Sequence, residues 1–501
     1  MKRRDFFKTS LAASAVIVSD TLNAGTTRQP NDSQEVSKIA FPEKRPLITY
    51  SDRPPLLETP RDAFTKEITP NDEFFVRWHM PKIPTHMNIE DYFITVDGLV
   101  EKPLYVSLKS LKEDYEQVEL TAVLQCGGNS RTAFVPQTSG IQWGSGAMGC
   151  ASWKGVKLND ILKKAGVKKE SRWITLNGSD KAAFHKTPNF ARELELHEVK
   201  DNVIIAYEMN GEDLPYLNGY PVRLIIPGAY SDSWVKMLDH ITLSAEYKEL
   251  FFMDTAYRIP DNECECETPE NIATKSKPIT TMNVKSLIGY PTRDSLIKMN
   301  SKVTLKGVAF DSGHGIKEVL ISFDKGESWE NAVLGNESSV YGFRVFKYSF
   351  IPKSKADVTI MAKAINNIGE EQPFAKDIKW NHGGYKYNGI DSVTIKVSKT
   401  MKVILLTLIF LATLNAEYTK PVKLPNITFE MVIDKDFGVM QRNCQWCHSF
   451  GYVTNQGNQS REFWRDVVVK MRDVYKAPIS QKDEKLATDY LYRYFGDGGK
   501  K

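Results

Sequence analysis

Short apolar runs separated by polar residues fill the first half of the chain and predict a mixed domain. Apolar stretches at 93–96, 203–207 and 222–226 have the length of buried strands, and a helical spacing of apolar residues covers 158–165. Because strands and helices are mixed here, we predict an α+β domain at residues 41–260.

A different pattern follows. Apolar and polar residues alternate at 302–310, and a second apolar run lies at 319–323, with turn residues Asp324-Lys325-Gly326 after it. We therefore predict an all-β sandwich at residues 278–399. The charged, proline-containing stretch before it, which includes Cys264-Glu265-Cys266, indicates a connection between domains.

The last part, residues 417–501, is short and has the periodicity of helices. Two sets of apolar residues each fall on one helical face: Phe463, Val467 and Met471, then Leu486, Tyr490 and Leu491. We predict a small all-α domain of a size that suits an electron carrier.

The first residues have the pattern of an export signal. Residues 1–24 begin with Met1-Lys2-Arg3-Arg4-Asp5-Phe6, a twin-arginine pattern, and end at Leu22-Asn23-Ala24, a small-residue cleavage site. Twin-arginine export carries proteins that are already folded, commonly because a cofactor is inserted first. The pattern therefore predicts the periplasm as the location and a cofactor in the first domain.

A second signal lies inside the chain. Residues 401–416 open with Met401-Lys402, continue as a dense apolar run and close with Leu414-Asn415-Ala416, like a Sec-type signal peptide. The run is short for a bilayer span, and a membrane anchor or a buried element between two domains is the alternative. We expect two separately made polypeptides, written end to end with the junction at Thr400/Met401.

Composition and charge exclude some classes of protein. The formal net charge of the 501 residues is only +4, and the basic residues are scattered among acidic ones, so no nucleic-acid partner is expected. Six cysteines in a chain of this length do not make a disulfide scaffold. Each cysteine is therefore interpreted from its neighbours.

The segment Cys444-Gln445-Trp446-Cys447-His448 has the spacing of a c-type haem attachment site. Cys444 and Cys447 suit the two vinyl groups of the porphyrin, and His448 suits the iron as proximal ligand. A zinc site needs four ligands, and 417–501 contains no other cysteine or histidine. A thioredoxin-like redox pair lacks the surrounding βαβ pattern. We predict haem c and a cytochrome c fold for 417–501.

The second axial ligand of this haem is predicted to be Met471, the only methionine after His448. A thioether ligand raises the haem potential, which suits an acceptor of electrons. The segment around Met471 also resembles small bacterial cytochromes c, in which the methionine is the ligand. The alternative is that Met471 only packs in the core, since it lies on an apolar helical face.

Cys126 follows an apolar run directly and opens the glycine-rich turn Cys126-Gly127-Gly128-Asn129-Ser130-Arg131. A cysteine at a strand end, beside polar and flexible residues, is expected to be exposed and deprotonated. Cys150 has no such setting, and we interpret it as a small core residue.

Cationic and polar residues gather in two further segments. Arg77 and His79 end a strand and could bind an anion, while Arg223, Ser231, Ser233 and Lys236 surround the turn Pro227-Gly228 and could hold a phosphate. Each residue alone has an ordinary structural alternative; their combination indicates an anion site.

Seven segments in order carry a resemblance to a known family. They are residues 75–79, 125–131, 140–147, 206–211, 219–223, 235–238 and 254–257. Residues 41–398 resemble the sulfite oxidase family of molybdenum enzymes, with its molybdopterin domain and its immunoglobulin-like dimerisation domain. The resemblance is strongest to bacterial sulfite:cytochrome c oxidoreductases, which pair this subunit with a small haem c subunit that 417–501 resembles.

The resemblance implies roles for individual residues. Cys126 would supply the thiolate to molybdenum, and Tyr257 would be the active-site tyrosine. Arg77 would hold the oxyanion, with His79 near it and Trp143 as a wall of the pocket. The candidates for holding molybdopterin and its phosphate are Asn129, Arg131, Arg223, Ser231, Ser233 and Lys236.

The chain departs from the animal enzymes of this family at several positions. Gly128 stands in place of an alanine, Asn218 in place of a histidine, and Gly144 in place of an arginine. The family often brings a basic residue from the β domain, for which Lys386 is the nearest candidate. These differences bear on substrate affinity more than on the reaction type.

The resemblance implies oxidation of sulfite to sulfate at molybdenum, with single electrons passing through haem c to a soluble cytochrome c. It also implies association of the molybdenum and haem subunits, and the β domain suggests a homodimer. Two alternatives stay open: another reaction of the same family, such as sulfoxide or nitrate reduction, and a general electron carrier with no dedicated enzyme partner.

Overall fold

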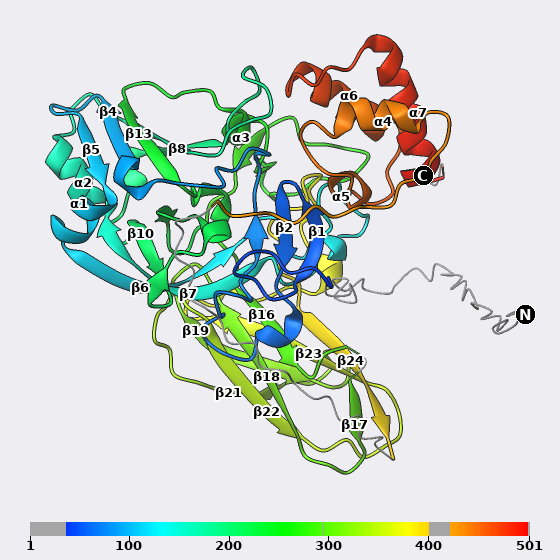
Figure 1. Ribbon diagram of the computed structural model, residues 1–501. Helices are drawn as coiled ribbons and strands as arrows, with labels where there is room; N and C mark the ends of the chain where they lie inside the picture. Colours follow the sequence, from blue (N-terminus) through cyan, green and yellow to red (C-terminus); the bar gives the residue numbers. More distant parts are fainter. Residues whose placement is uncertain (1–36, 294, 400–420, 499–501) are drawn as a thin grey trace, which may run out of the picture.

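The computed structural model describes residues 37–293, 295–399 and 421–498. Both predicted signals, 1–24 and 401–416, and the junction at Thr400/Met401 therefore lie outside the described residues. The chain folds into a first domain, a β-sandwich and a C-terminal helical part. The β-sandwich lies below the first domain, and the C-terminal helices lie at its upper right (Figure 1).

The first domain is built around two five-stranded sheets. One sheet has the order β11 (Glu212–Asp213), β10 (Ile204–Met209), β7 (Met148–Lys157) and β6 (Gln117–Gln125), with β12 (Arg223–Ile225) also paired to β10. The other has the order β5 (Leu104–Ser107), β4 (Phe93–Gly98), β13 (Leu238–Ser244), β8 (Trp173–Gly178) and β9 (Ala191–Glu195). A small sheet contains β1 (Ile48–Asp52), β2 (Pro55–Glu58) and β3 (Val76–Arg77).

Helices cover parts of these sheets, namely α1 (Leu108–Glu113), α2 (Leu158–Ala165) and α3 (Phe251–Asp254). The helix predicted at 158–165 is confirmed as α2. Its buried side chains recur at helical spacing, and Gly166 ends it in the left-handed conformation at φ 69°, where glycine carries no Cβ penalty. The predicted strands at 93–96, 203–207 and 222–226 are present as β4, β10 and β12, with ends shifted by a few residues.

Residues 285–398 form the predicted β-sandwich. A four-stranded sheet has the order β16 (Lys285–Tyr290), β18 (Val303–Phe310), β22 (Arg344–Phe350) and β21 (Val333–Leu334). The facing sheet has the order β17 (Leu296–Lys298), β24 (Asp391–Ser398), β23 (Val358–Asn366), β19 (Ile316–Ser322) and β20 (Glu330–Asn331). Alternate residues of the long strands point into one shared core, as the sequence pattern predicts.

The connection between the two domains is more ordered than the sequence predicts. At its two ends, β14 (Arg258–Pro260) and β15 (Ser276–Pro278) pair as antiparallel strands. Between them a disulfide joins Cys264 to Cys266. Cys150 is confirmed as a core residue. It is fully buried in a cluster that contains side chains of both domains, and the Phe343 N–H donates to its sulfur at 3.4 Å.

A buried ion pair also joins these domains. Arg61 of the first domain donates two hydrogen bonds to the carboxylate of Asp391 in the sandwich, at 2.9 Å and 3.1 Å. Only 7% of the Arg61 side chain and 5% of the Asp391 side chain is exposed. This buried ion pair therefore links the first domain to the sandwich within their interface.

We expect an Arg61→Met chain to be strongly destabilised, because the Asp391 carboxylate stays buried without its main partner. The free energy of unfolding should fall by about 3–5 kcal/mol, measured by urea denaturation. Arg45→Met is the control, since Arg45 pairs with Glu73 while 44% of its side chain is exposed. Its loss should be below about 1 kcal/mol. Equal effects of the two substitutions would contradict the expectation.

The C-terminal part is helical, as predicted. It contains α4 (Phe437–Cys444), α5 (Gly451–Thr454), α6 (Arg461–Asp473) and α7 (Gln481–Phe495). The side chains of Ser460 and Ser480 cap α6 and α7 by accepting N–H bonds of the first turn. No helix among 37–293, 295–399 and 421–498 is both long and apolar enough to cross a bilayer.

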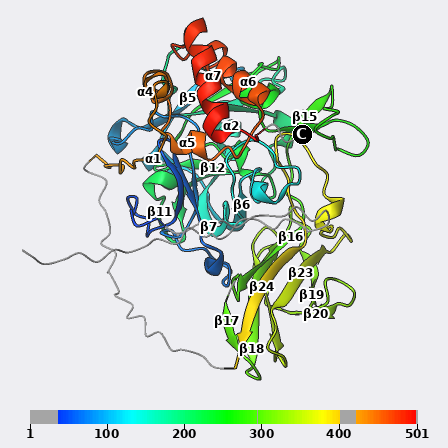
Figure 2. The ribbon, with the colours of Figure 1, turned by 90° about the vertical axis from the view of Figure 1, so that its right-hand side faces the viewer.

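This helical part contacts the first domain directly (Figure 2). The Ser449 N–H donates to Arg53 O at 2.7 Å, and the Asn455 side chain donates to Tyr50 O at 2.9 Å. The backbones of α5 and β1 pack so closely that a Cβ on Gly451 would lie only 2.3 Å from Tyr50 O. The C-terminal part is thus held by backbone contacts to β1 and the turn after it.

Candidate functional site

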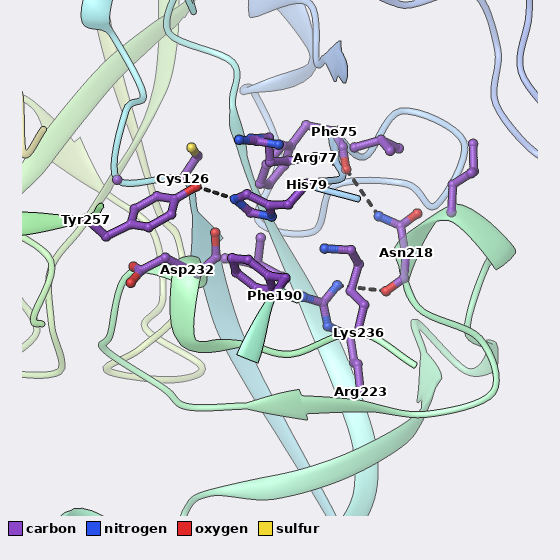
Figure 3. Close-up of a pocket in the computed structure, with 15 residues that line it drawn as sticks. Phe75, Arg77, His79, Cys126, Phe190, Asn218, Arg223, Asp232, Lys236 and Tyr257 are labelled. Atoms are coloured by element: carbon purple, nitrogen blue, oxygen red, sulfur yellow. Dashed lines mark hydrogen bonds between the residues drawn. The ribbon is translucent and has the colours of Figure 1, made fainter. Parts of the chain in front are cut away.

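Two cavities meet at the ends of β3 and β6 in the first domain. The inner cavity, drawn in Figure 3, lies within that domain. The outer cavity has a volume of about 370 Å³, and all three parts of the chain line it. Four side chains line both: Arg77, His79, Cys126 and Tyr257.

Cys126 lies at the centre of this junction, directly after β6. Its N–H donates to Ala147 O at 3.0 Å, and the glycine-rich turn folds back so that the Asn129 N–H donates to Cys126 O at 3.0 Å. The expectation of an exposed cysteine is wrong. Cys126 is only 6% exposed, and burial raises the pKa of its thiol despite the nearby charges of Arg77 and Arg131.

Cys126 is buried among apolar side chains from segments distant in the sequence, such as Phe75 and Trp143, which is why local polarity misled the prediction. A loop of the sandwich domain also reaches the turn after Cys126, where the Lys386 N–H donates to Gly127 O at 2.9 Å. The thiol therefore opens only toward the two cavities. A metal bound there would stabilise its thiolate.

Arg77 and His79 lie at the end of β3 and face the same space. His79 Nε2 forms a hydrogen bond with the Tyr257 hydroxyl, and its ring stacks on Phe190 with centroids 3.8 Å apart. Burial, and then the charges of Arg77, Lys236 and Arg192, hold the pKa of His79 well below its ordinary value. The imidazole is thus neutral, whereas the guanidinium of Arg77 stays charged in proteins.

Buried cations dominate the inner cavity. The Arg223 guanidinium donates to Asn218 O at 2.7 Å and to Trp234 O at 3.2 Å, and burial lowers its pKa to about 9. Burial likewise lowers the pKa of Lys236 to about 7, and the charge of Arg223 adds to this. Two cationic groups so close together, with no carboxylate of the described ranges among the hydrogen-bond partners of Arg223, form a site that an anion would stabilise.

The outer cavity brings the C-terminal motif to the first domain. Cys444, Cys447, His448 and Met471 line it together with apolar side chains that include Phe463, Val467 and Leu491. Burial lowers the pKa of His448 to about 4, so its imidazole is neutral and can act as a ligand. Tyr452 stacks on the His448 ring with centroids 5.2 Å apart and lines the same cavity as Arg77.

Comparison with known proteins identifies the family. A family profile for the oxidoreductase molybdopterin binding domain matches residues 79–252, and one for the Mo-co oxidoreductase dimerisation domain matches residues 276–398. The sulfite oxidase of Arabidopsis thaliana is 30% identical over 370 residues, which cover 68% of this chain and 92% of the plant protein. The chain belongs to the sulfite oxidase family.

Two further relatives mark the range of this family. The mitochondrial sulfite oxidase of Drosophila melanogaster is 30% identical over 378 residues, 71% of this chain, which spans 64% of the fly protein. The sulfane dehydrogenase SoxCD of Paracoccus pantotrophus shares the fold, with a TM-score of 0.59 and 24% identity over 77% of this chain and 94% of that one. The fold of a molybdopterin oxidoreductase domain followed by a dimerisation domain is thereby confirmed.

The buried polar atoms around the site fit the molybdopterin of the sulfite oxidase family. Within the described residues, His79 Nδ1 and Arg223 Nε, at two residues that line the inner cavity, are buried with no hydrogen-bond partner. Such atoms are costly to bury unless a bound group satisfies them. A polar, anionic cofactor with sulfur ligands would find the Cys126 thiol on one side and the two cations on the other.

The structure separates the other predicted residues of this family site into two groups. Ser231 lines the inner cavity, and Trp143 and Arg131 line the outer one. Asn129 and Ser233 line neither cavity. Asn129 Oδ1 accepts the Ala147 N–H at 3.1 Å, and Ser233 Oγ lies 3.5 Å from the Arg192 guanidinium. These two residues lie behind the cavity walls.

Sequence reasoning expected Lys386 as the contribution of the sandwich domain and missed two other residues. Tyr385 and His382 line the outer cavity, whereas Lys386 does not. Lys386 is in the left-handed conformation at φ 64°, and burial lowers the pKa of its amine, although the charge of Glu265 opposes this shift. No local signal marks Tyr385, because it reaches the site only through the domain contact.

Proposed function

We propose that this chain oxidises sulfite to sulfate at a molybdenum centre bound through Cys126, and that electrons leave through haem c. The observation that carries this proposal is the outer cavity. Arg77 and Cys126 of the first domain line it together with Cys447 and His448 of the haem-attachment motif. A substrate site and an electron exit in one cavity suit an oxidation coupled to a carrier.

The side chains have distinct tasks in this proposal. When bound, molybdopterin with its metal supplies oxygen-atom transfer and takes up two electrons. Arg77 binds the substrate dianion from the cavity wall, where its fixed guanidinium needs little reorganisation. His79, being neutral, donates or accepts one hydrogen bond without a charge of its own, and Tyr257 fixes its Nε2. Trp143 closes the wall and limits water access.

The haem would be held by the residues of the C-terminal part. Cys444 and Cys447 are free thiols in this part, and their attachment to the vinyl groups would leave His448 facing the iron. Met471 lines the same cavity and is the proposed second axial ligand. A soluble cytochrome c is the proposed acceptor, and the periplasm is the proposed location, which the signal patterns at 1–24 and 401–416 support.

The direct test uses the purified chain with its molybdenum and haem contents measured. We expect sulfite to reduce the bound haem, seen in its absorption bands, and to drive reduction of added cytochrome c. Nitrate and a sulfoxide, offered with a reduced dye, are the control substrates for the alternative family reactions. Fully loaded protein that does not react with sulfite would overturn the proposal. Mass spectrometry would establish whether one chain or two are present, and light scattering whether the molybdenum part is a dimer.

A matched pair of glycine substitutions tests the role of the contact between α5 and β1. Gly451→Ala places a Cβ 2.3 Å from Tyr50 O and 2.6 Å from the Phe429 ring. We therefore expect the substitution to displace the C-terminal part from β1. Haem reduction by sulfite should slow at least about tenfold, because electron transfer depends on the fixed geometry of both parts.

Gly438→Ala in α4 is the control for this prediction. Its Cβ would meet only Arg442 Nη1, at 3.9 Å, so the substitution leaves the contact unchanged. Stopped-flow absorption of the haem measures both variants. Equal haem reduction rates in the two would show that the contact with β1 is not used.

A further inference from the structure

Tyr385 is a residue of the sandwich domain that lies against the active-site tyrosine. Its ring stacks on Tyr257 with centroids 5.5 Å apart and an interplanar angle of 30°. The Tyr257 N–H donates to the Tyr385 hydroxyl oxygen at 3.4 Å. Both residues line the outer cavity, and burial raises the pKa of each, so both are neutral.

Tyr257 needs external support, because its backbone is in the left-handed region at φ 59°. A bulky residue adopts this conformation only when its surroundings hold it there. Its carbonyl accepts the Ile279 N–H at 2.9 Å, which fixes one side of the peptide. The Tyr385 hydroxyl fixes the other side, and the stacked rings set the direction of the Tyr257 side chain toward His79.

Tyr385 can give this support because its own loop is rigid. Asn381 binds the backbone of Tyr385 twice, accepting its N–H and donating to its carbonyl, both at 2.9 Å. Arg131 donates to Gly383 O at 3.0 Å, and its guanidinium lies 5.3 Å from the centre of the Tyr385 ring. The loop is thus attached to the turn that carries Cys126.

We propose that Tyr385 is the positioning residue for Tyr257, so that the sandwich domain sets the geometry of the oxyanion site. The proposal rests on the function proposed above, in which Arg77 binds the substrate anion and Tyr257 fixes His79 beside it. Tyr385 acts through Tyr257. Removing its hydroxyl should therefore weaken anion binding only while the Tyr257 hydroxyl is present.

The test is a double-mutant cycle in the full loaded chain, with sulfate as the anion probe in isothermal titration calorimetry. Tyr385→Phe should raise the sulfate Kd about fivefold, the effect of one hydrogen bond. Tyr257→Phe should raise it at least as much. The double variant should match Tyr257→Phe alone, because residues that act through one another are not additive. Sulfite KM should follow the same order.

Tyr387→Phe is the matched control. It lies in the same loop, and its buried hydroxyl has no hydrogen-bond partner within the described residues. Its sulfate Kd should equal that of the unchanged chain. Additive effects of the two tyrosine variants, or an unchanged Kd in Tyr385→Phe, would overturn the positioning role. Because sulfate binding needs no turnover, a failure of sulfite oxidation in the unchanged chain is a separate result that overturns only the function.

Discussion

A Cys126→Ser chain is expected to lose sulfite oxidation down to the background rate while its haem spectrum stays unchanged. The serine hydroxyl is a poor replacement for a thiolate ligand to molybdenum. The fold around position 126 should survive, because the backbone bonds of the turn do not involve the sulfur and the substitution nearly conserves volume. Activity per molybdenum, with metal content from mass spectrometry, is the measurement.

Cys150→Ala separates this effect from a general loss of packing. Cys150 is fully buried in the shared core of the two domains and lies outside both cavity linings. The variant should keep its activity per molybdenum and lose about 1 kcal/mol of stability. Sulfite oxidation by Cys126→Ser at a rate near that of Cys150→Ala would refute the ligand assignment.

The second large effect is expected from Arg77→Met, which removes the cation proposed to bind the substrate dianion. Values of kcat/KM for sulfite should fall about a hundredfold to a thousandfold, the range found when one fixed donor to a charged transition state is lost. Steady-state kinetics over a wide sulfite range, normalised to molybdenum content, measures this fall.

Arg77→Lys distinguishes charge from geometry at this position. It keeps the positive charge but loses the planar fork of donors, so an intermediate loss of about tenfold is expected. If the methionine variant retained the kcat/KM of the unchanged chain, the anion would have to bind elsewhere in the cavity.

Local sequence pattern predicted many of the elements, and together with the family resemblance it predicted which residues gather at the site. The helix at 158–165 and the strands of the sandwich follow from periodicity, because one face of each is buried in a core close by in the sequence. Arg77, His79, Cys126 and Tyr257 were singled out from local motifs together with the resemblance, and the structure brings all four side chains to one place.

The rest depends on contacts between distant segments, which no local pattern encodes. Cys126 has a polar neighbourhood in the sequence, yet it is buried in a core built from segments far apart in the chain. Lys386 was chosen for its charge, but the backbone turns it away and presents Tyr385 instead. The disulfide between Cys264 and Cys266 was also missed, because the composition of that stretch predicts only a connection.

The loop that carries Tyr385 also sets a limit on how this protein can be divided. Although the sandwich has its own core, its loop is a wall of the pocket and is bonded to the turn after Cys126 through the Lys386 N–H. A first domain cut off at residue 260 would therefore keep Cys126 and the cations of the inner cavity. It would lack the part of the outer cavity wall that the sandwich loop forms. The sandwich forms part of the cavity wall, so exchanging it for that of a relative would alter the space in which the proposed substrate binds.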